Sequence, residues 1–247
     1  MMTETFSEEL KKGLSELSLC LSEVQREQLF EYYSMVVEKN KVMNLTGITD
    51  EREFVIKHII DSLSLVKAGM PITELLTSGS RLIDIGTGAG MPGVILKIAF
   101  PSLSVVLFDS LKKRLNFLDE VIEALSLKDI ETLHGRAEDM GQDNDYRESF
   151  DIAVSRAVAR LNVLSEYSLP FVKPGGAFIP YKSGDIAEEL KEAKNAIAML
   201  GGHLERDVRF RLPDSDMERS IIIIRKVKPT PSAYPRKAGV PSKKPIM

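Results

Sequence analysis

Short apolar segments alternate with amphipathic segments from residue 80 onward, and this alternation constrains the fold more than any other feature of the chain. The apolar segments have the length of strands, and the segments between them have helical periodicity. Strands connected through helices pair in parallel, because a crossover helix returns the chain to the same end of the sheet. The sequence therefore predicts an α/β fold, a mostly parallel sheet with helices on both faces.

The expected elements follow one another without a long gap. Strands are predicted at residues 81–86, 104–109, 130–134, 151–155 and 177–181, and helices at 92–100, 112–125 and 161–169. A helix at 186–200 then leads to strands at 208–212 and 220–226, which can pair as an antiparallel hairpin. Together these segments predict a seven-stranded, Rossmann-like sheet.

The residues before the first strand have helical signals instead. Ser22 and Gln25 have the spacing of a capping box at a helix start, and Asp50 with Glu53 repeats that pattern. No Pro/Gly-rich linker separates this part from the sheet. Residues 1–70 are therefore expected to form a helical cap on the main domain, residues 71–228.

The C-terminal end is basic, although the formal net charge of the chain is -3. Eight lysines and arginines and no acidic residue follow Glu218, and residues 229–247 contain five prolines. This composition predicts an extended basic arm with no core of its own, suited to contact with phosphates. Two alternatives stay open: a solvated tail, and a segment that packs on the body with Tyr234 as its anchor.

Composition excludes several classes of protein. Cys20 is the single cysteine, and His58, His134 and His203 are scattered, so neither a disulfide framework nor a metal site is expected. No apolar segment approaches the roughly 20 residues of a membrane span, and the N-terminus is acidic where a signal peptide is basic. We therefore expect a cytoplasmic protein that does not contact a membrane.

A glycine-rich loop follows the first expected strand. The segment Asp84-Ile85-Gly86-Thr87-Gly88-Ala89-Gly90 joins that strand to a helix that Pro92 can begin. Glycines allow sharp turns and let a ligand approach the backbone without meeting a Cβ. Asp109 ends the second strand, at roughly the 20-residue spacing from which an acid reaches ribose hydroxyls. The pattern predicts a nucleotide-like cofactor at this edge of the sheet.

Two cofactors fit such a loop. Gly88, Gly90 and Gly93 have the spacing G-x-G-x-x-G, which is also found in nicotinamide-dependent dehydrogenases. Asp84 would be unfavourable beside a pyrophosphate, but it can attract the ammonium group of a methionine moiety. The chain also shows no obvious acid or base for hydride transfer at a strand end. These points favour S-adenosylmethionine, with a nicotinamide oxidoreductase as the alternative.

The residues that end the fourth strand indicate which kind of atom would be methylated. Methylation of exocyclic amines usually needs a polar-Pro-Pro-aromatic segment, and methylation of pyrimidine carbons needs a cysteine, but this strand ends in Ser155-Arg156-Ala157. Guanine N7 carries an exposed lone pair and no proton, so positioning suffices and no catalytic base is expected. Arg156 can neutralise the cofactor carboxylate or hold a phosphate. The alternative is that it pairs with Asp151 or Glu138.

The segment after the third strand lies where an adenine would bind. It reads Arg136-Ala137-Glu138-Asp139, and Glu138 or the neighbouring backbone can accept a hydrogen bond from the exocyclic amine. The alternative is a plain helix N-terminus with acids on its dipole.

These segments together resemble the RsmG family, also called glucose-inhibited division protein B, of bacterial 16S ribosomal RNA guanine-N7 methyltransferases. The resemblance covers nearly the whole chain. It is carried by residues 44–46, 57–63, 84–93, 109–114, 136–138 and 155–157, and by the tail from Tyr234 to Pro245.

The resemblance implies a class I methyltransferase fold, S-adenosylmethionine as cofactor and 16S ribosomal RNA as partner. We expect the protein to be a monomer. The form of that RNA stays open: naked, in the small subunit or in an assembly intermediate. Met91 replaces a common phenylalanine or leucine, and Lys182 precedes Ser183 where a glycine is usual. The expected cofactor contacts are Asp84, Gly86, Gly88, Gly90, Met91, Asp109, Ala137, Glu138 and Arg156. The expected substrate contacts are Arg156, Lys182, Arg236, Lys237, Lys243 and Lys244.

Overall fold

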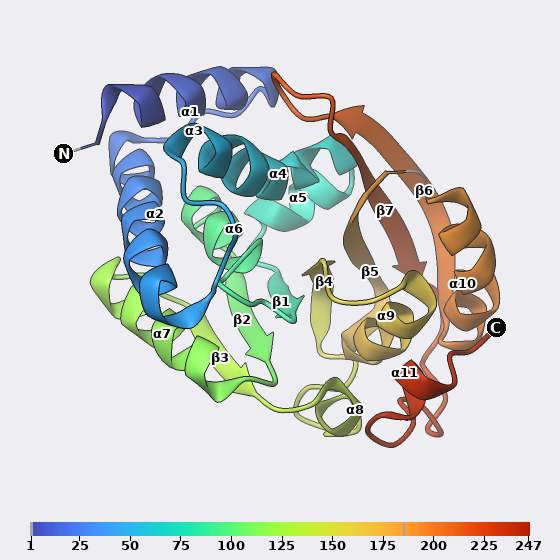
Figure 1. Cartoon of the computed structure of the whole chain (residues 1–247). Helices are drawn as coiled ribbons and strands as arrows, with labels where there is room; N and C mark the ends of the chain where they lie inside the picture. Colours follow the sequence, from blue (N-terminus) through green and yellow to red (C-terminus); the bar gives the residue numbers. More distant parts are fainter. Residues whose placement is uncertain (1, 185) are drawn as a thin grey trace.

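A single seven-stranded sheet runs through the centre of the molecule (Figure 1). The structure is a computed structural model that describes residues 2–184 and 186–247. Neighbouring strands follow the order β3-β2-β1-β4-β5-β7-β6, with β7 antiparallel to both of its neighbours and every other pair parallel. The strands are β1 Arg81–Ile85, β2 Ser104–Asp109, β3 Ile130–His134, β4 Phe150–Arg156, β5 Val172–Ser183, β6 Gly202–Arg211 and β7 Glu218–Lys226. This confirms the predicted α/β fold.

Two strands, β5 and β6, begin five and six residues earlier than the sequence predicts. β5 begins at Val172 rather than at residue 177, because the Lys173-Pro174-Gly175-Gly176 segment, which indicates a turn, lies within the strand. A Cβ on Gly176 would lie 2.5 Å from the carbonyl oxygen of Asp151, so glycine permits this close approach. β6 begins at Gly202 rather than at residue 208, since its first half is a polar edge strand without an apolar signal.

Alternate residues of the central strands point to opposite faces and bury two separate clusters. Leu82 of β1 lies in the cluster under the N-terminal helices, whereas Ile83 faces the cluster on the other side. The main-domain helices are α6 Gly93–Ala99, α7 Lys112–Ala124, α8 Ala137–Met140, α9 Leu161–Ser168 and α10 Ala187–Met199. Of the helices predicted here, α6, α7, α9 and α10 have bounds close to those expected, and the short α8 lies at the predicted helix N-terminus.

The N-terminal helices pack into the same core as one face of the sheet. Ser22 and Gln25 form the predicted capping box, and Asp50 accepts a bond from the amide of Glu53. The helices are α1 Glu4–Glu16, α2 Glu23–Met43, α3 Glu51–Phe54, a π-helical turn η1 Val55–Ile60, α4 Asp61–Leu63, a 3-10 segment η2 Ser64–Ala68 and α5 Ile72–Thr77. Helix α1 was not predicted from the sequence, although Thr3 caps it and its buried residues follow helical spacing.

The C-terminal segment packs on the main domain and is not the predicted arm without a core. Tyr234 contacts the second cluster, in which Ile246 is buried. The guanidinium of Arg147 donates to four carbonyl oxygens, three of them within residues 230–234. These bonds satisfy backbone that has no sheet or long helix to pair with. A short helix, α11 Val240–Lys243, follows and lies beside α8 and α9 (Figure 1). The C-terminal segment therefore matches the alternative prediction, in which it packs on the body of the protein with Tyr234 as its anchor.

Within the described residues, no helix has both the length and the apolar character that crossing a membrane requires.

Candidate functional site

The glycine loop lies where the sheet changes direction. The chain passes from β1 outward to β2 and β3 and then returns to β4 on the other side of β1, and open parallel sheets bind ligands at such a switch point, beside the carboxyl ends of the strands. Gly86, Gly88 and Gly90 have φ angles of 71°, 60° and 101°. A Cβ on Gly90 would lie 2.6 Å from Val94 Cγ2 and 2.8 Å from Leu118 Cδ2. The loop therefore needs glycine both for its backbone angles and for its packing.

Asp84 is fully buried beneath this loop and has an oxygen with no partner. Its Oδ2 accepts from the hydroxyl of Thr87 at 2.7 Å and from the amide of Gly93 at 2.9 Å. Its Oδ1 has no hydrogen-bond partner among the described residues. Burial raises the pKa of this carboxyl to about 6, against the effect of the two hydrogen bonds. A buried, unpartnered carboxylate oxygen is costly, and it fits the ammonium group of a bound methionine moiety.

Asp109 ends β2 beside the same loop and orders its backbone. Oδ2 accepts from the amide of Gly88 at 3.0 Å, and Oδ1 accepts from the amide of Leu111 at 2.9 Å. Oδ2 also accepts from Arg114 Nη1 at 3.4 Å, whereas Oδ1 can accept a second bond, so the group can also serve a ligand hydroxyl. The two predicted acids therefore lie at neighbouring strand ends, both in contact with the glycine segment.

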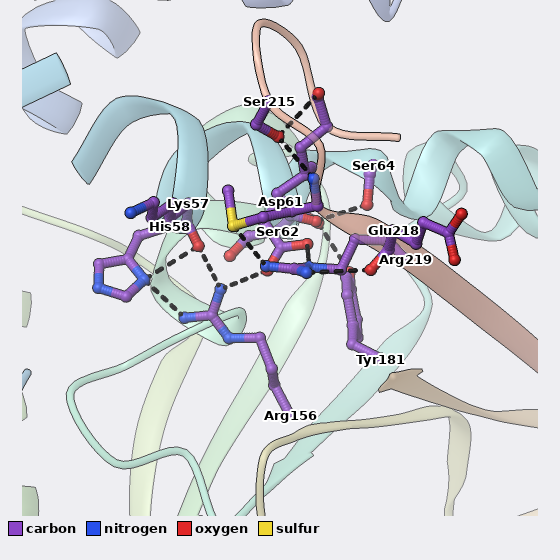
Figure 2. Close-up of polar contacts among 12 residues, drawn as sticks. Lys57, His58, Asp61, Ser62, Ser64, Arg156, Tyr181, Ser215, Glu218 and Arg219 are labelled. Carbon is purple, nitrogen blue, oxygen red and sulfur yellow. Dashed lines mark hydrogen bonds and ion pairs between the residues drawn. The ribbon is translucent and has the colours of Figure 1, made fainter. Parts of the chain in front are cut away.

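A buried ion cluster lies at the ends of β4 and β7 (Figure 2). Asp61 is 3% exposed. Its Oδ2 lies 3.1 Å from Arg156 Nη1, and its Oδ1 lies 3.1 Å from Arg219 Nε. Arg156 also donates to the carbonyl of Lys57 at 3.2 Å. Arg156 therefore pairs with Asp61, and not with either of the two acidic partners considered from the sequence alone.

His58 is neutral and joins this cluster to the N-terminal cap. Its Nδ1 lies 3.3 Å from Arg156 Nη2, and its Nε2 lies 2.8 Å from Thr46 Oγ1. Burial and the neighbouring guanidinium of Arg156 lower the pKa of His58 to about 3. Nδ1 also lies 3.1 Å from the carbonyl oxygen of Lys57, so its role is set by the tautomer: it accepts from Arg156, or it donates to that carbonyl while Nε2 accepts from the Thr46 hydroxyl.

The ion cluster forms one wall of an open cleft of about 740 Å³. The cleft continues along the ends of β4 and β5 and is bordered by the loop after β4, where Ala157 has a φ of 57°. Val158 of that loop lies against Gly86, so the cleft adjoins the glycine loop. Basic side chains outnumber acidic ones in the lining: Lys57, Arg156, Arg160, Lys182 and Arg219 against Asp61 and Glu189. Lys57 and Arg160 also pair with Glu53 and Glu192, so the cleft has a small excess of positive charge.

The other predicted cofactor contacts lie around the loop and at the end of β3. Met91 is 6% exposed and belongs to the first core cluster. Ala137 begins α8 and packs against the second cluster. Glu138 Oε1 accepts from the amide of Gly239 at 2.8 Å, which joins the C-terminal segment to α8.

Several predicted substrate contacts already have protein partners. Lys182 Nζ donates to the carbonyl of Ala159 at 2.8 Å and to Glu189 at 2.6 Å, although it still lines the cleft. Arg236 forms an ion pair of 2.6 Å with Glu166, whose side chain is 1% exposed. The remaining predicted contacts, Lys237, Lys243 and Lys244, are exposed in the C-terminal segment.

No role was predicted from the sequence for Asp61 or His58, and Arg219 was counted only among the basic residues of the C-terminal end. Asp61 follows two isoleucines in an apolar helical segment, and a carboxylate in such a place indicates a buried partner. Nothing local identifies that partner, since Arg156 and Arg219 are 95 and 158 residues away in the chain.

The strand order, the reversed last strand and the acids at the first two strand ends define a class I methyltransferase fold, as predicted. Solved structures support this fold at low identity. TrmN from Thermus thermophilus has a TM-score of 0.52 at 18% identity, over 68% of this chain and 48% of that one. A putative sarcosine dimethylglycine methyltransferase from Galdieria sulphuraria has a TM-score of 0.54 at 13% identity, over 72% and 88%.

The family follows from sequence comparison. The family model described as GidB, rRNA small subunit methyltransferase G, matches residues 25–217. A protein named ribosomal RNA small subunit methyltransferase G from Lachnoclostridium phytofermentans is 53% identical over 96% of both chains. A protein of that name from Acetivibrio thermocellus is 50% identical over 96% of this chain and 95% of its own. This chain belongs to the GidB family, which confirms the resemblance.

Proposed function

We propose that this protein is an S-adenosylmethionine-dependent methyltransferase that methylates N7 of a guanine in 16S ribosomal RNA. Family membership supports the reaction class and the small-subunit RNA. The observation that carries the cofactor assignment is the buried Asp84 carboxylate, with one oxygen unpartnered beneath the glycine loop among the described residues. A pyrophosphate beside this carboxylate would be repelled, whereas an ammonium group would complete its hydrogen bonding.

Four parts of the site would hold the cofactor. Asp84 would bind the ammonium group, and Asp109 the ribose hydroxyls. The backbone at Ala137 and Glu138 would contact the adenine. Gly86, Gly88 and Gly90 would present the loop backbone to the cofactor, Met91 would pack alongside, and Arg156 would neutralise the methionine carboxylate.

The basic cleft would receive the target nucleotide. It adjoins the glycine loop, so a base within it lies next to the cofactor position. The guanidinium groups of Arg156 and Arg219 have fixed orientations, because both are bound to buried Asp61. Fixed cations suit anionic groups: Arg156 would serve the methionine carboxylate, and Arg219 a phosphate of the RNA strand, which would otherwise be repelled by a chain of net negative charge.

The proposed reaction requires the protein mainly to position the guanine base next to the methyl group. Bound S-adenosylmethionine supplies a methyl group on a positively charged sulfur. Transfer of that methyl group to the lone pair of N7 would release S-adenosylhomocysteine and would need no proton transfer, so the residues of the cleft would only have to hold the base in place. The titratable residues of the cleft agree with this: His58 is a weak base with a pKa of about 3, and Asp61 and Glu189 are paired with cations.

Two binding experiments test this proposal. Calorimetry should detect S-adenosylhomocysteine and not NAD. Binding of NAD alone would favour the nicotinamide oxidoreductase that the G-x-G-x-x-G spacing also allows. Methylation assays with naked 16S RNA, small subunits and assembly intermediates would then identify the form of the substrate.

A further inference from the structure

Helix α2 of the N-terminal cap crosses the two helices that follow β1 and β2, and one of its faces bonds to their ends. Gln25 Nε2 donates to the carbonyl of Ile98 at 2.8 Å, at the end of α6. Gln28 Nε2 donates to the carbonyl of Leu125 at 2.9 Å, at the end of α7. One turn further, the hydroxyl of Tyr32 donates to the carbonyl of Ala89 at 2.8 Å. The positions i, i+3 and i+7 share a helix face, so α2 spans α6 from its end to the loop that precedes it.

The contact at Ala89 differs from the other bonds that hold the glycine loop. The amide groups of the loop bond to the main domain itself: Gly86 and Thr87 to Phe108, and Gly88 to Asp109. The Ala89 carbonyl, in the centre of the loop, accepts from a side chain of the cap. Tyr32 is fully buried, so no bulk water can replace its hydroxyl without local rearrangement.

The packing around Gly90 shows how closely this side chain fits. A Cβ at that position would lie 3.3 Å from the Tyr32 hydroxyl, as well as against Val94 and Leu118. The ring of Tyr32 is in turn fixed by an edge contact with Phe54, whose centroid is 6.3 Å away. The hydroxyl is therefore held at one place, beside the residues that need positive φ angles.

We propose that Tyr32 is a positioning residue for cofactor binding, which holds the glycine loop in its binding conformation from the N-terminal cap. This inference rests on the proposed function, since it concerns the same cofactor. A loop rich in glycine has many conformations to lose, so a bond that fixes its central carbonyl lowers the entropy cost of binding. By linkage, bound cofactor stabilises α2 in return.

A matched pair of variants tests this role. Tyr33→Phe removes the same kind of bond from the same helix, because the Tyr33 hydroxyl donates to the carbonyl of Thr49 at 2.9 Å, away from the glycine loop. In calorimetry, Tyr32→Phe should raise the Kd for S-adenosylhomocysteine about tenfold, and Tyr33→Phe by less than about twofold. In steady-state assays, Tyr32→Phe should raise the KM for the cofactor and leave kcat at saturation unchanged.

Equal affinity of Tyr32→Phe and wild type would overturn the inference, and so would an equal reduction in both variants, which would indicate general damage to the cap. If Tyr32→Phe does not fold, hydrogen exchange of the wild-type protein decides. Amides of α2 should exchange more slowly when S-adenosylhomocysteine is added, and unchanged exchange there would reject the role. Failure of the wild-type protein to bind S-adenosylhomocysteine would instead reject the proposed function.

Discussion

At the scale of single residues, the buried Asp84 carboxyl makes the cofactor assignment testable by pH. Burial raises its pKa from an ordinary value of 3.8 to about 6. Between these two values the folded protein binds more protons than the unfolded chain, so this group lowers stability as pH rises through that window. A bound ammonium group needs the deprotonated form. Cofactor affinity should therefore rise with pH up to about 6 and then level off.

The measurement is the Kd for S-adenosylhomocysteine between about pH 5 and 8, with Asp84→Asn as the control. Each unit of pH below the pKa should weaken wild-type binding by up to about tenfold, since the protonated fraction grows by that factor. Asp84→Asn should bind weakly at every pH with no such slope. A wild-type profile that stays flat across this range would contradict the role given to Asp84.

Asp109 is the second residue whose role can be measured directly. Removing a carboxylate that accepts from ribose hydroxyls should cost roughly 1.5–3 kcal/mol of cofactor binding. Because Asp109 also accepts from the amides of Gly88 and Leu111, Asp109→Ala could weaken binding through the loop alone. A cofactor product lacking the 2′-hydroxyl separates the two effects. Wild type should bind it less well than S-adenosylhomocysteine, and Asp109→Ala should bind both alike. Equal discrimination by both proteins would remove the ribose assignment.

At the scale of elements, the ion pair between the C-terminal segment and α9 should support the fold. Arg236→Ala would leave Glu166 buried without its cation, which typically costs about 3–5 kcal/mol. Lys237→Ala changes a neighbouring exposed cation and should alter the free energy of unfolding by no more than about 0.5 kcal/mol. Denaturant unfolding of both variants checks this. Equal stability would show that the Arg236 pair contributes little, leaving that side chain available to RNA.

The sequence predicted elements best where their signals are local. Ser22 and Gln25 identified the start of α2 because a capping box is formed by neighbours in the chain. Asp84 and Asp109 were found from their places at strand ends, which the parallel sheet brings together. The partner of Asp61 could not be found in this way, because it depends on how the cap packs against β4 and β7. The packing of the proline-rich end was missed for the same reason, since Arg147 and Glu166 hold it from distant parts of the chain.

At the scale of the whole molecule, the exposed lysines of the C-terminal segment can be tested separately from Arg236, which pairs with Glu166. A triple alanine variant of Lys237, Lys243 and Lys244 should retain its stability and its affinity for S-adenosylhomocysteine. If these lysines bind phosphates of single-stranded RNA, the log–log salt dependence of RNA affinity should flatten by about 0.7 for each phosphate that the variant no longer neutralises. An unchanged salt slope would place RNA binding in the cleft and not in this segment.

Absence of a catalytic base has its own kinetic signature. Because N7 is unprotonated near neutral pH, the single-turnover rate should not rise with pH once the cofactor site is saturated. Rates measured between about pH 6 and 9 check this. A steep rise across that range would indicate a base within or near the cleft and would contradict direct transfer.

We propose that this molecule transfers a methyl group to N7 of one guanine in 16S ribosomal RNA. The most direct test is incubation of the purified protein with labelled S-adenosylmethionine and small-subunit RNA taken from a strain that lacks the gene, followed by nucleoside analysis and mapping. We expect labelled 7-methylguanosine at a single position, and none when Asp84→Asn replaces the wild-type protein. Label in any other nucleoside, or no label in naked RNA, subunits or assembly intermediates, would contradict the account.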